Sequence, residues 1–251
     1  MKLYFAVLIA APLLAQPMAP DPISKERALG KALAAEHRRM APPVDLPAVQ
    51  GYVSRIGGRL TSFLPELPHP YRFEVVRSDS AEPAALPGGY VLVPDSLLVA
   101  VQSEDELAGA LAHAVSHIAG RFGVGSGPAG NLVFMGGHGG LHADVRNPSL
   151  TSVGFRSRRH EAEVEADRMG VRLAAEAGFD PAALRRYLDR VRPVAAGIEI
   201  REARLAALDE AVRGLPSVAP SAPEEFLWAQ EALHSTRDKA QARPAPTLRR
   251  R

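Results

Sequence analysis

The segment "LAGALAHAVSHIAG", residues 107–120, decides how the rest of the chain is interpreted. Its alanine- and leucine-rich pattern is typical of a helix buried in a protein core. His113 and His117 are four residues apart, so a helix projects both rings from one face, about one turn apart. This is the spacing with which one helix holds a zinc ion, although two histidines packed in a core would show it too. The residue between them that follows the first histidine is Ala114.

A second segment, "RRHEAEVEADRMG" at residues 158–170, places carboxylates at the same helical spacing. Glu163 and Asp167 are four residues apart and therefore share one face of a helix. A glutamate from a separate helix is a common third zinc ligand beside two histidines, and a nearby aspartate can orient one of them. Taken alone, this segment also fits a solvated acidic face paired with the arginines around it.

Composition restricts the chemistry that the chain can use. The 251 residues include no cysteine, which excludes a thiolate nucleophile, a cysteine zinc site and disulfides, so histidines and carboxylates must hold any metal. The formal net charge is +2 and acids and bases are interspersed, so we expect no nucleic acid partner.

The first 20 residues, "MKLYFAVLIAAPLLAQPMAP", have the pattern of a secretory signal peptide. Lys2 precedes an apolar run from Leu3 to Leu14, and the small residue Ala15 follows. The run is shorter than the roughly 20 residues of a membrane-spanning helix, and Pro12 interrupts it, which disfavours the alternative of a membrane anchor. We expect cleavage near Ala15, export to the periplasm or outside the cell, and no membrane-spanning segment afterwards.

The rest of the chain predicts an α+β fold that is mostly helical, with one small β-sheet and a helix carrying His-x-x-x-His. Capping signals start helices at Ser24, at Ser103 with Glu106, and at Asp180 with Pro181. The predicted helices span 24–40, 45–64, 103–123, 158–177, 200–213 and 224–239, with one more from 180; the predicted strands lie in 71–78 and 87–94. Gly123 should end the third helix, and the glycine-rich residues 120–140 should be irregular. We expect a zinc domain over 21–213, then a proline-rich linker, a last helix and a disordered basic tail over 214–251.

Three segments together resemble peptidase family M48. They read "PGGYVLVPDSLL" at 87–98, "SEDELAGALAHAVSHIAGRFG" at 103–123 and "EAEVEADRMGVRLAAEAGFDP" at 161–181, within a similarity from Tyr71 to Arg192. These gluzincin zinc peptidases include the CAAX prenyl protease, heat-shock membrane peptidases and periplasmic outer-membrane quality-control peptidases. The resemblance implies a gluzincin-like fold and the endopeptidase reaction type.

The resemblance also implies the roles of particular residues. One zinc ion would be bound by His113, His117 and Glu163, with Asp167 supporting a ligand from behind. An extended or unfolded polypeptide would lie along a sheet edge, because an edge strand offers main-chain hydrogen bonds to any sequence. The residues implied for that edge strand are Gly89, Tyr90, Val91, Leu92 and Val93.

The chain departs from the family pattern at two places. Ala114 stands where the family has its general base, a glutamate that takes a proton from water and delivers it to the leaving amine. The histidine–proline stretch usual before an R-x-x-R-I-like helix is also missing from "PVAAGIEIREARLAAL", residues 193–208. Loss of positioned acid–base help costs about 10²–10⁴-fold in rate, whereas metal affinity need not fall because the glutamate is not a ligand.

Other polar residues could substitute in part. His160 is three residues before Glu163 and shares its helical face, so it is a candidate substitute base or extra ligand, as well as an ordinary surface histidine. His138 and His142 are also four apart, but the glycines around them disfavour a helix and a metal role. Ser116 lacks a positioned base and is rejected as a nucleophile.

Three hypotheses follow. The favoured one is an exported zinc-binding pseudopeptidase that binds polypeptides in protein quality control and hydrolyses them weakly or not at all. The second is an active zinc endopeptidase that uses a substitute base such as His160. The third is a metal-free structural or chaperone-like module. The oligomeric state is not predicted.

Overall fold

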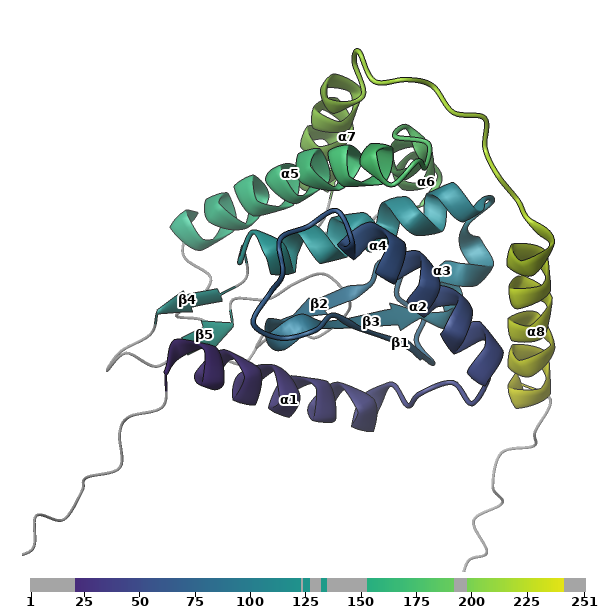
Figure 1. Cartoon of the computed structure of the whole chain (residues 1–251), viewed down its shortest axis with the longest axis horizontal. Coiled ribbons are helices and arrows are strands. Elements are labelled where there is room, and N and C mark those ends of the chain that lie inside the picture. Colours follow the sequence, from purple (N-terminus) through teal and green to yellow (C-terminus); the bar gives the residue numbers. More distant parts are fainter. Residues whose placement is uncertain (1–20, 123, 127–131, 135–152, 192–197, 242–251) are drawn as a thin grey trace, which may run out of the picture.

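The computed structural model describes residues 21–122, 124–126, 132–134, 153–191 and 198–241 (Figure 1). It confirms the mostly helical α+β fold. The helices are α1 Pro22–Met40, α2 Pro47–Thr61, α3 Asp95–Ala100, α4 Glu104–Ala119, α5 Val153–Glu176, α6 Ala183–Arg190, α7 Ile198–Ala211 and α8 Glu224–Gln241. The strands are β1 Arg72–Val76, β2 Ala84–Leu86, β3 Tyr90–Pro94, β4 Val124–Ser126 and β5 Leu132–Phe134, with a 3₁₀ turn η1 at Pro87–Gly89.

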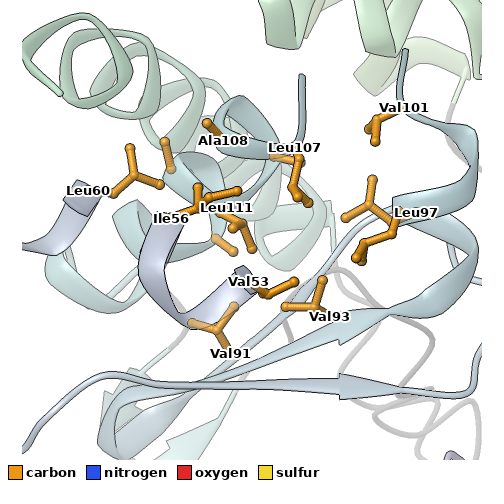
Figure 2. Packing of buried hydrophobic residues seen from close by; sticks show 14 of the residues in the cluster. Val53, Ile56, Leu60, Val91, Val93, Leu97, Val101, Leu107, Ala108 and Leu111 are labelled. Atoms are coloured by element: carbon orange, nitrogen blue, oxygen red, sulfur yellow. The ribbon is translucent and has the colours of Figure 1, made fainter. Parts of the chain in front are cut away.

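Helix α4 is the centre of the fold. Its residues from Asp105 to Ile118 are all buried, because α2 and the sheet lie on one side of it and α5 on the other (Figure 1). Figure 2 shows Leu107 and Leu111 of this helix among the apolar side chains of α2 and β3. Burial of this apolar surface is the main stabilising term, and it fixes both the position and the rotation of the helix.

The three-stranded sheet separates two apolar clusters. Val91 and Val93 of β3 point toward α2 and α4, whereas Leu92 packs with Ala34 of α1 on the other face. Side chains of a strand alternate between the two faces, so this strand, apolar throughout, is covered on both sides.

The prediction that Gly89 to Val93 forms an edge strand is wrong. The strand order is β1-β3-β2, so β3 is central: it pairs in parallel with β1 and antiparallel with β2. Gly89 belongs to the η1 turn, where Gly88 and Gly89 have φ of +74° and +86°. Glycine adopts this left-handed region without strain, so the chain reverses and folds Ala84–Leu86 back onto β3. The outer strands of this sheet are β1 and β2.

Several helix starts differ from the prediction by two to five residues, and for α1 and α6 a hydrogen bond explains the difference. Helix α1 begins at Pro22 rather than Ser24, because the Asp21 carboxylate accepts the N–H of Ser24 at 2.9 Å and is therefore the cap. Helix α6 begins at Ala183, after a turn in which the Asp180 carboxylate accepts the N–H two residues on at 3.1 Å. In both cases an aspartate carboxylate accepts a hydrogen bond from a backbone N–H near the helix start that has no acceptor within the helix.

The glycine-rich residues 120–140 were predicted to be irregular, yet β4 and β5 form an antiparallel pair within them. Helix α8 confirms the predicted last helix; it packs near α2 and α3, with Phe226 and Leu233 buried in the main core. The predicted signal peptide, 1–20, and the tail after 241 lie outside the described residues. None of the described helices is both long and apolar enough to cross a membrane.

Candidate metal centre

The start of α4 is fixed by its cap. Ser103 Oγ accepts a hydrogen bond from the N–H of Glu106 at 3.2 Å. The Glu106 carboxylate accepts one from the N–H of Gln102 at 2.8 Å, whereas in a capping box it would bind the N–H of the cap residue, Ser103. The helix ends at Ala119 with Gly120 as its cap, earlier than predicted; Gly123 lies outside the described residues.

The two histidines of α4 meet in the interior. His113 is 1% exposed and His117 is 7% exposed, and their Nε2 atoms are 3.2 Å apart. The rings lie edge to face, with an interplanar angle of 82°. Helical periodicity alone accounts for this placement, because the two residues are one turn apart on the same face.

Helix α5 brings Glu163 to the same point. Its Oε2 atom lies 3.4 Å from His113 Nε2 and 3.3 Å from His117 Nε2, and the side chain is 2% exposed. The close approach of α5 to α4 depends on Gly170, where a Cβ atom would come within 2.9 Å of the His113 backbone nitrogen. A glycine is needed here because any side chain would push the two helices apart.

These three donor atoms have the arrangement that a tetrahedral zinc ion requires. Their separations of 3.2, 3.4 and 3.3 Å form a nearly equilateral triangle. At zinc–ligand distances of about 2.0–2.1 Å, two ligands of a tetrahedron are separated by about 3.3–3.4 Å. We searched the described residues for groups of three or more His, Cys, Asp or Glu side chains whose donor atoms lie within 4.8 Å of one another. The group found is His113, His117 and Glu163. The residues present therefore form a group that could hold a metal ion, and the donor set fits zinc.

Asp167 lies behind the first histidine. Its Oδ1 atom is 2.8 Å from His113 Nδ1, and the side chain is fully buried. A carboxylate at Nδ1 fixes the ring orientation and leaves Nε2 to face the metal position. The contact is compatible with the role predicted for Asp167, which stays a prediction.

Two residues beside this centre were not predicted. Arg204 of α7 donates from Nε and Nη2 to the two Asp167 oxygens at 2.8 and 2.9 Å. Its Nη1 donates to both oxygens of Glu82 at 3.0 and 2.9 Å. Glu82 Oε2 in turn lies 3.9 Å from His113 Nε2. Arg204 is four residues before the buried Leu208, so the sequence could have indicated its burial only as a charge on an apolar helix face. No sequence pattern indicates that Glu82 belongs to the centre.

The buried charges of this network shift one another's pKa. Burial and Arg204 lower the pKa of His113, but Asp167 and Glu163 raise it more, and the net result is about 9. Burial raises the pKa of Asp167, but Arg204 and His113 outweigh it and hold that pKa below its usual value. Without metal, a proton on His113 therefore compensates the carboxylates, and a metal ion must displace it.

The remaining predicted residues divide into two groups. Ala114 is 1% exposed and packs in the apolar core. Ser116 Oγ donates to the carbonyl oxygen of Ala112 at 2.8 Å, consistent with a structural hydroxyl. The side chain of His160, and His138 and His142 altogether, lie outside the described residues, so their roles remain predictions.

A buried His–His–Glu cluster on two packed helices, beside a small sheet, defines a metallopeptidase-like protein. Residues 47–127, which include both histidines, match the model of peptidase family M48. This match agrees with the resemblance found in the sequence.

Several relatives carry the name beta-barrel assembly-enhancing protease. The proteins of Escherichia coli K12 and Yersinia pestis are each 27% identical over 184 residues, which is 67% of this chain and 38% of theirs. A putative beta-barrel assembly-enhancing protease of Vibrio cholerae matches over the same shares. This chain therefore spans 38% of the length of these relatives.

Proposed function

We propose that this protein is an exported zinc-binding member of the family, with a centre that binds extended polypeptide and hydrolyses it only weakly. One zinc ion would be held by His113, His117 and Glu163. The observation that carries the proposal is the triangle of donor atoms, whose sides of 3.2–3.4 Å match one face of a zinc tetrahedron. The N-terminal sequence pattern supports export to the periplasm or outside the cell.

Ala114 is the reason to expect weak hydrolysis. When bound, zinc supplies a Lewis acid that polarises a peptide carbonyl and acidifies water. By resemblance, position 114 corresponds to the family's proton-transferring glutamate, and the methyl group of Ala114 transfers no proton. The apolar packing of Ala114 leaves the histidines of the same helix in place, so metal binding and efficient proteolysis are separable here.

The polypeptide would lie along β2 rather than β3. Strand β2 is an outer strand of the sheet, and it starts two residues after Glu82, which lies next to His113. An outer strand aligns an extended chain through main-chain hydrogen bonds, largely independent of sequence. The name of the relatives, beta-barrel assembly-enhancing protease, supports beta-barrel proteins as candidate clients.

The test is zinc analysis together with cleavage of an unfolded protein such as casein. The purified protein should hold one zinc ion per chain, which a strong chelator removes. Ala114→Glu should keep the zinc and raise the chelator-sensitive cleavage rate by about 10²–10⁴-fold. Absence of stoichiometric zinc would favour a metal-free module, and rapid cleavage by the unaltered protein, with no gain in Ala114→Glu, would favour the active endopeptidase.

A further inference from the structure

We infer that Glu82 replaces the missing glutamate of position 114 and is the proton acceptor for the hydrolysis that the centre retains. The inference rests on the proposed zinc site and deepens it. Glu82 comes from a different part of the chain than the family's base: it lies just before β2, whereas position 114 lies on α4.

The position of Glu82 is the first observation. Its Oε2 atom is 3.9 Å from His113 Nε2, the atom that faces the metal position, and the side chain is 18% exposed. The carboxylate thus borders the centre and still reaches solvent. Asp167 cannot serve in this way, because it is fully buried behind the ring at Nδ1. Glu163 is itself one of the three donors of the triangle.

The distance distinguishes a proton acceptor from a fourth ligand. A fourth ligand would lie about 3.3–3.4 Å from each of the other three. Glu82 is farther from His113 than that, and it is not in the group whose donor atoms lie within 4.8 Å of one another. A carboxylate just outside the ligand positions would be within hydrogen-bonding reach of a water beside the metal position, which is what a general base requires.

Arg204 fixes this carboxylate in place. One guanidinium nitrogen donates to both Glu82 oxygens, while the other two nitrogens bind Asp167, and Arg204 is 4% exposed. A carboxylate offers about four acceptor positions, so pairing with Arg204 does not by itself exclude a hydrogen bond from water. Arg204 is therefore a positioning residue that ties the acceptor to the group that orients His113.

In the proposed step, Glu82 carries one proton from water to the departing amine. Water adds to the peptide carbonyl carbon as the Glu82 carboxylate takes one of its protons. A C–O bond forms, the C–N bond breaks, and Glu82 passes the proton to the departing amine nitrogen. The products are a carboxylic acid and an amine, and Glu82 returns to its ionised form.

The experiment compares Glu82→Gln with a matched control, Glu74→Gln. Glu74 is also paired with an arginine, Arg38, and has a similar side-chain exposure of 20%, but it lies in β1 and contacts α1. Each variant is assayed for zinc content, for casein cleavage, and for the affinity of a peptide hydroxamate by calorimetry. A hydroxamate gives up its hydroxyl proton to an adjacent carboxylate, so its binding reports the acceptor without catalysis.

We expect Glu82→Gln to keep one zinc per chain, to lose at least about 100-fold in chelator-sensitive cleavage, and to bind the hydroxamate about 10–100-fold more weakly. Glu74→Gln should match the unaltered protein in all three. Ala114→Glu in the Glu82→Gln background should restore cleavage, which shows that the variant is folded.

Two results would overturn the inference while leaving the zinc site intact. One is unchanged cleavage and hydroxamate affinity in Glu82→Gln. The other is an unaltered protein that holds zinc but shows no chelator-sensitive cleavage, with activity appearing only in Ala114→Glu. If no zinc is bound at all, the proposed function fails and the role of Glu82 fails with it.

Discussion

The two ends of helix α4 both bury charged or polar side chains, but they do so in different ways. At the N-terminal end, Asp105 and Glu106 are each 2% exposed and each bind donors of their own. At the C-terminal end, His113 and His117 meet Glu163 of α5, and one candidate ligand atom from each lies within 4.8 Å of the other two. The carboxylates at the N-terminal end are thus each bound by donors of the protein, whereas the side chains at the other end form a group that could hold a metal ion.

The N-terminal end is satisfied within the protein. The Asp105 oxygens accept the backbone N–H groups of Asp180 and Ser221 at 2.9 and 2.6 Å. Glu106 accepts from two nitrogens of Arg190, each at 2.6 Å. These carboxylates join α4 to α6 and to the segment before α8, and their hydrogen bonds offset the cost of burying the charges.

The largest expected effect is at the C-terminal end. His117→Ala removes one of three ligands and should abolish stoichiometric zinc binding. For the unaltered protein, free zinc at a thousandfold excess over its Kd should stabilise the fold by about 4 kcal/mol and raise the Tm. His37→Ala, which changes a buried histidine of α1, is the matched control and should keep that response. A zinc-dependent Tm in His117→Ala would contradict the assignment of the centre.

A smaller effect is expected at the satisfied end. Arg190→Met leaves the buried Glu106 carboxylate without its guanidinium partner and should lower the free energy of unfolding by about 2–3 kcal/mol. Because Arg190 is itself 35% exposed, the loss should fall below that for a fully buried pair. Denaturant titration measures the change.

The same variant also shows whether the two ends of α4 depend on each other. Folded Arg190→Met should still hold one zinc per chain, because no donor of the triangle touches this pair. A folded variant without zinc would show that the two ends of α4 are coupled.

The site could be predicted from the sequence as far as helical periodicity determines it. His113, His117, Glu163 and Asp167 lie at spacings that place each pair on one face, and the order of the motifs brings the two helices together. Glu82 and Arg204 are 122 residues apart in the chain, so only tertiary packing makes them partners. Local spacing contains no information about such a pair.

The sheet shows the same limit. The apolar run of β3 predicts a strand, but a strand covered on both faces has the same composition whether it is central or at an edge. The partner that makes β3 central is Ala84–Leu86, a short alanine-rich stretch with weak strand propensity. It becomes a strand because the Pro87–Gly89 turn places it beside β3, which is a consequence of backbone geometry rather than of side-chain pattern.

The smallest expected effect concerns the packing at the C-terminal end. In Gly170→Ala the added Cβ would lie 2.9 and 3.0 Å from the backbone N and Cα of His113, so α4 and α5 must separate slightly. We expect a loss of about 1–2 kcal/mol in unfolding free energy. Zinc affinity should also fall, because Glu163 moves away with α5.

The control variant is Gly58→Ala, on the exposed side of α2, where nothing lies within 4 Å of the new Cβ. Its free energy of unfolding should rise by up to about 1 kcal/mol, and its zinc affinity should not change. Equal zinc affinity in both variants, measured by competition with a chelator, would show that the ligand triangle tolerates a wider helix spacing than its geometry implies.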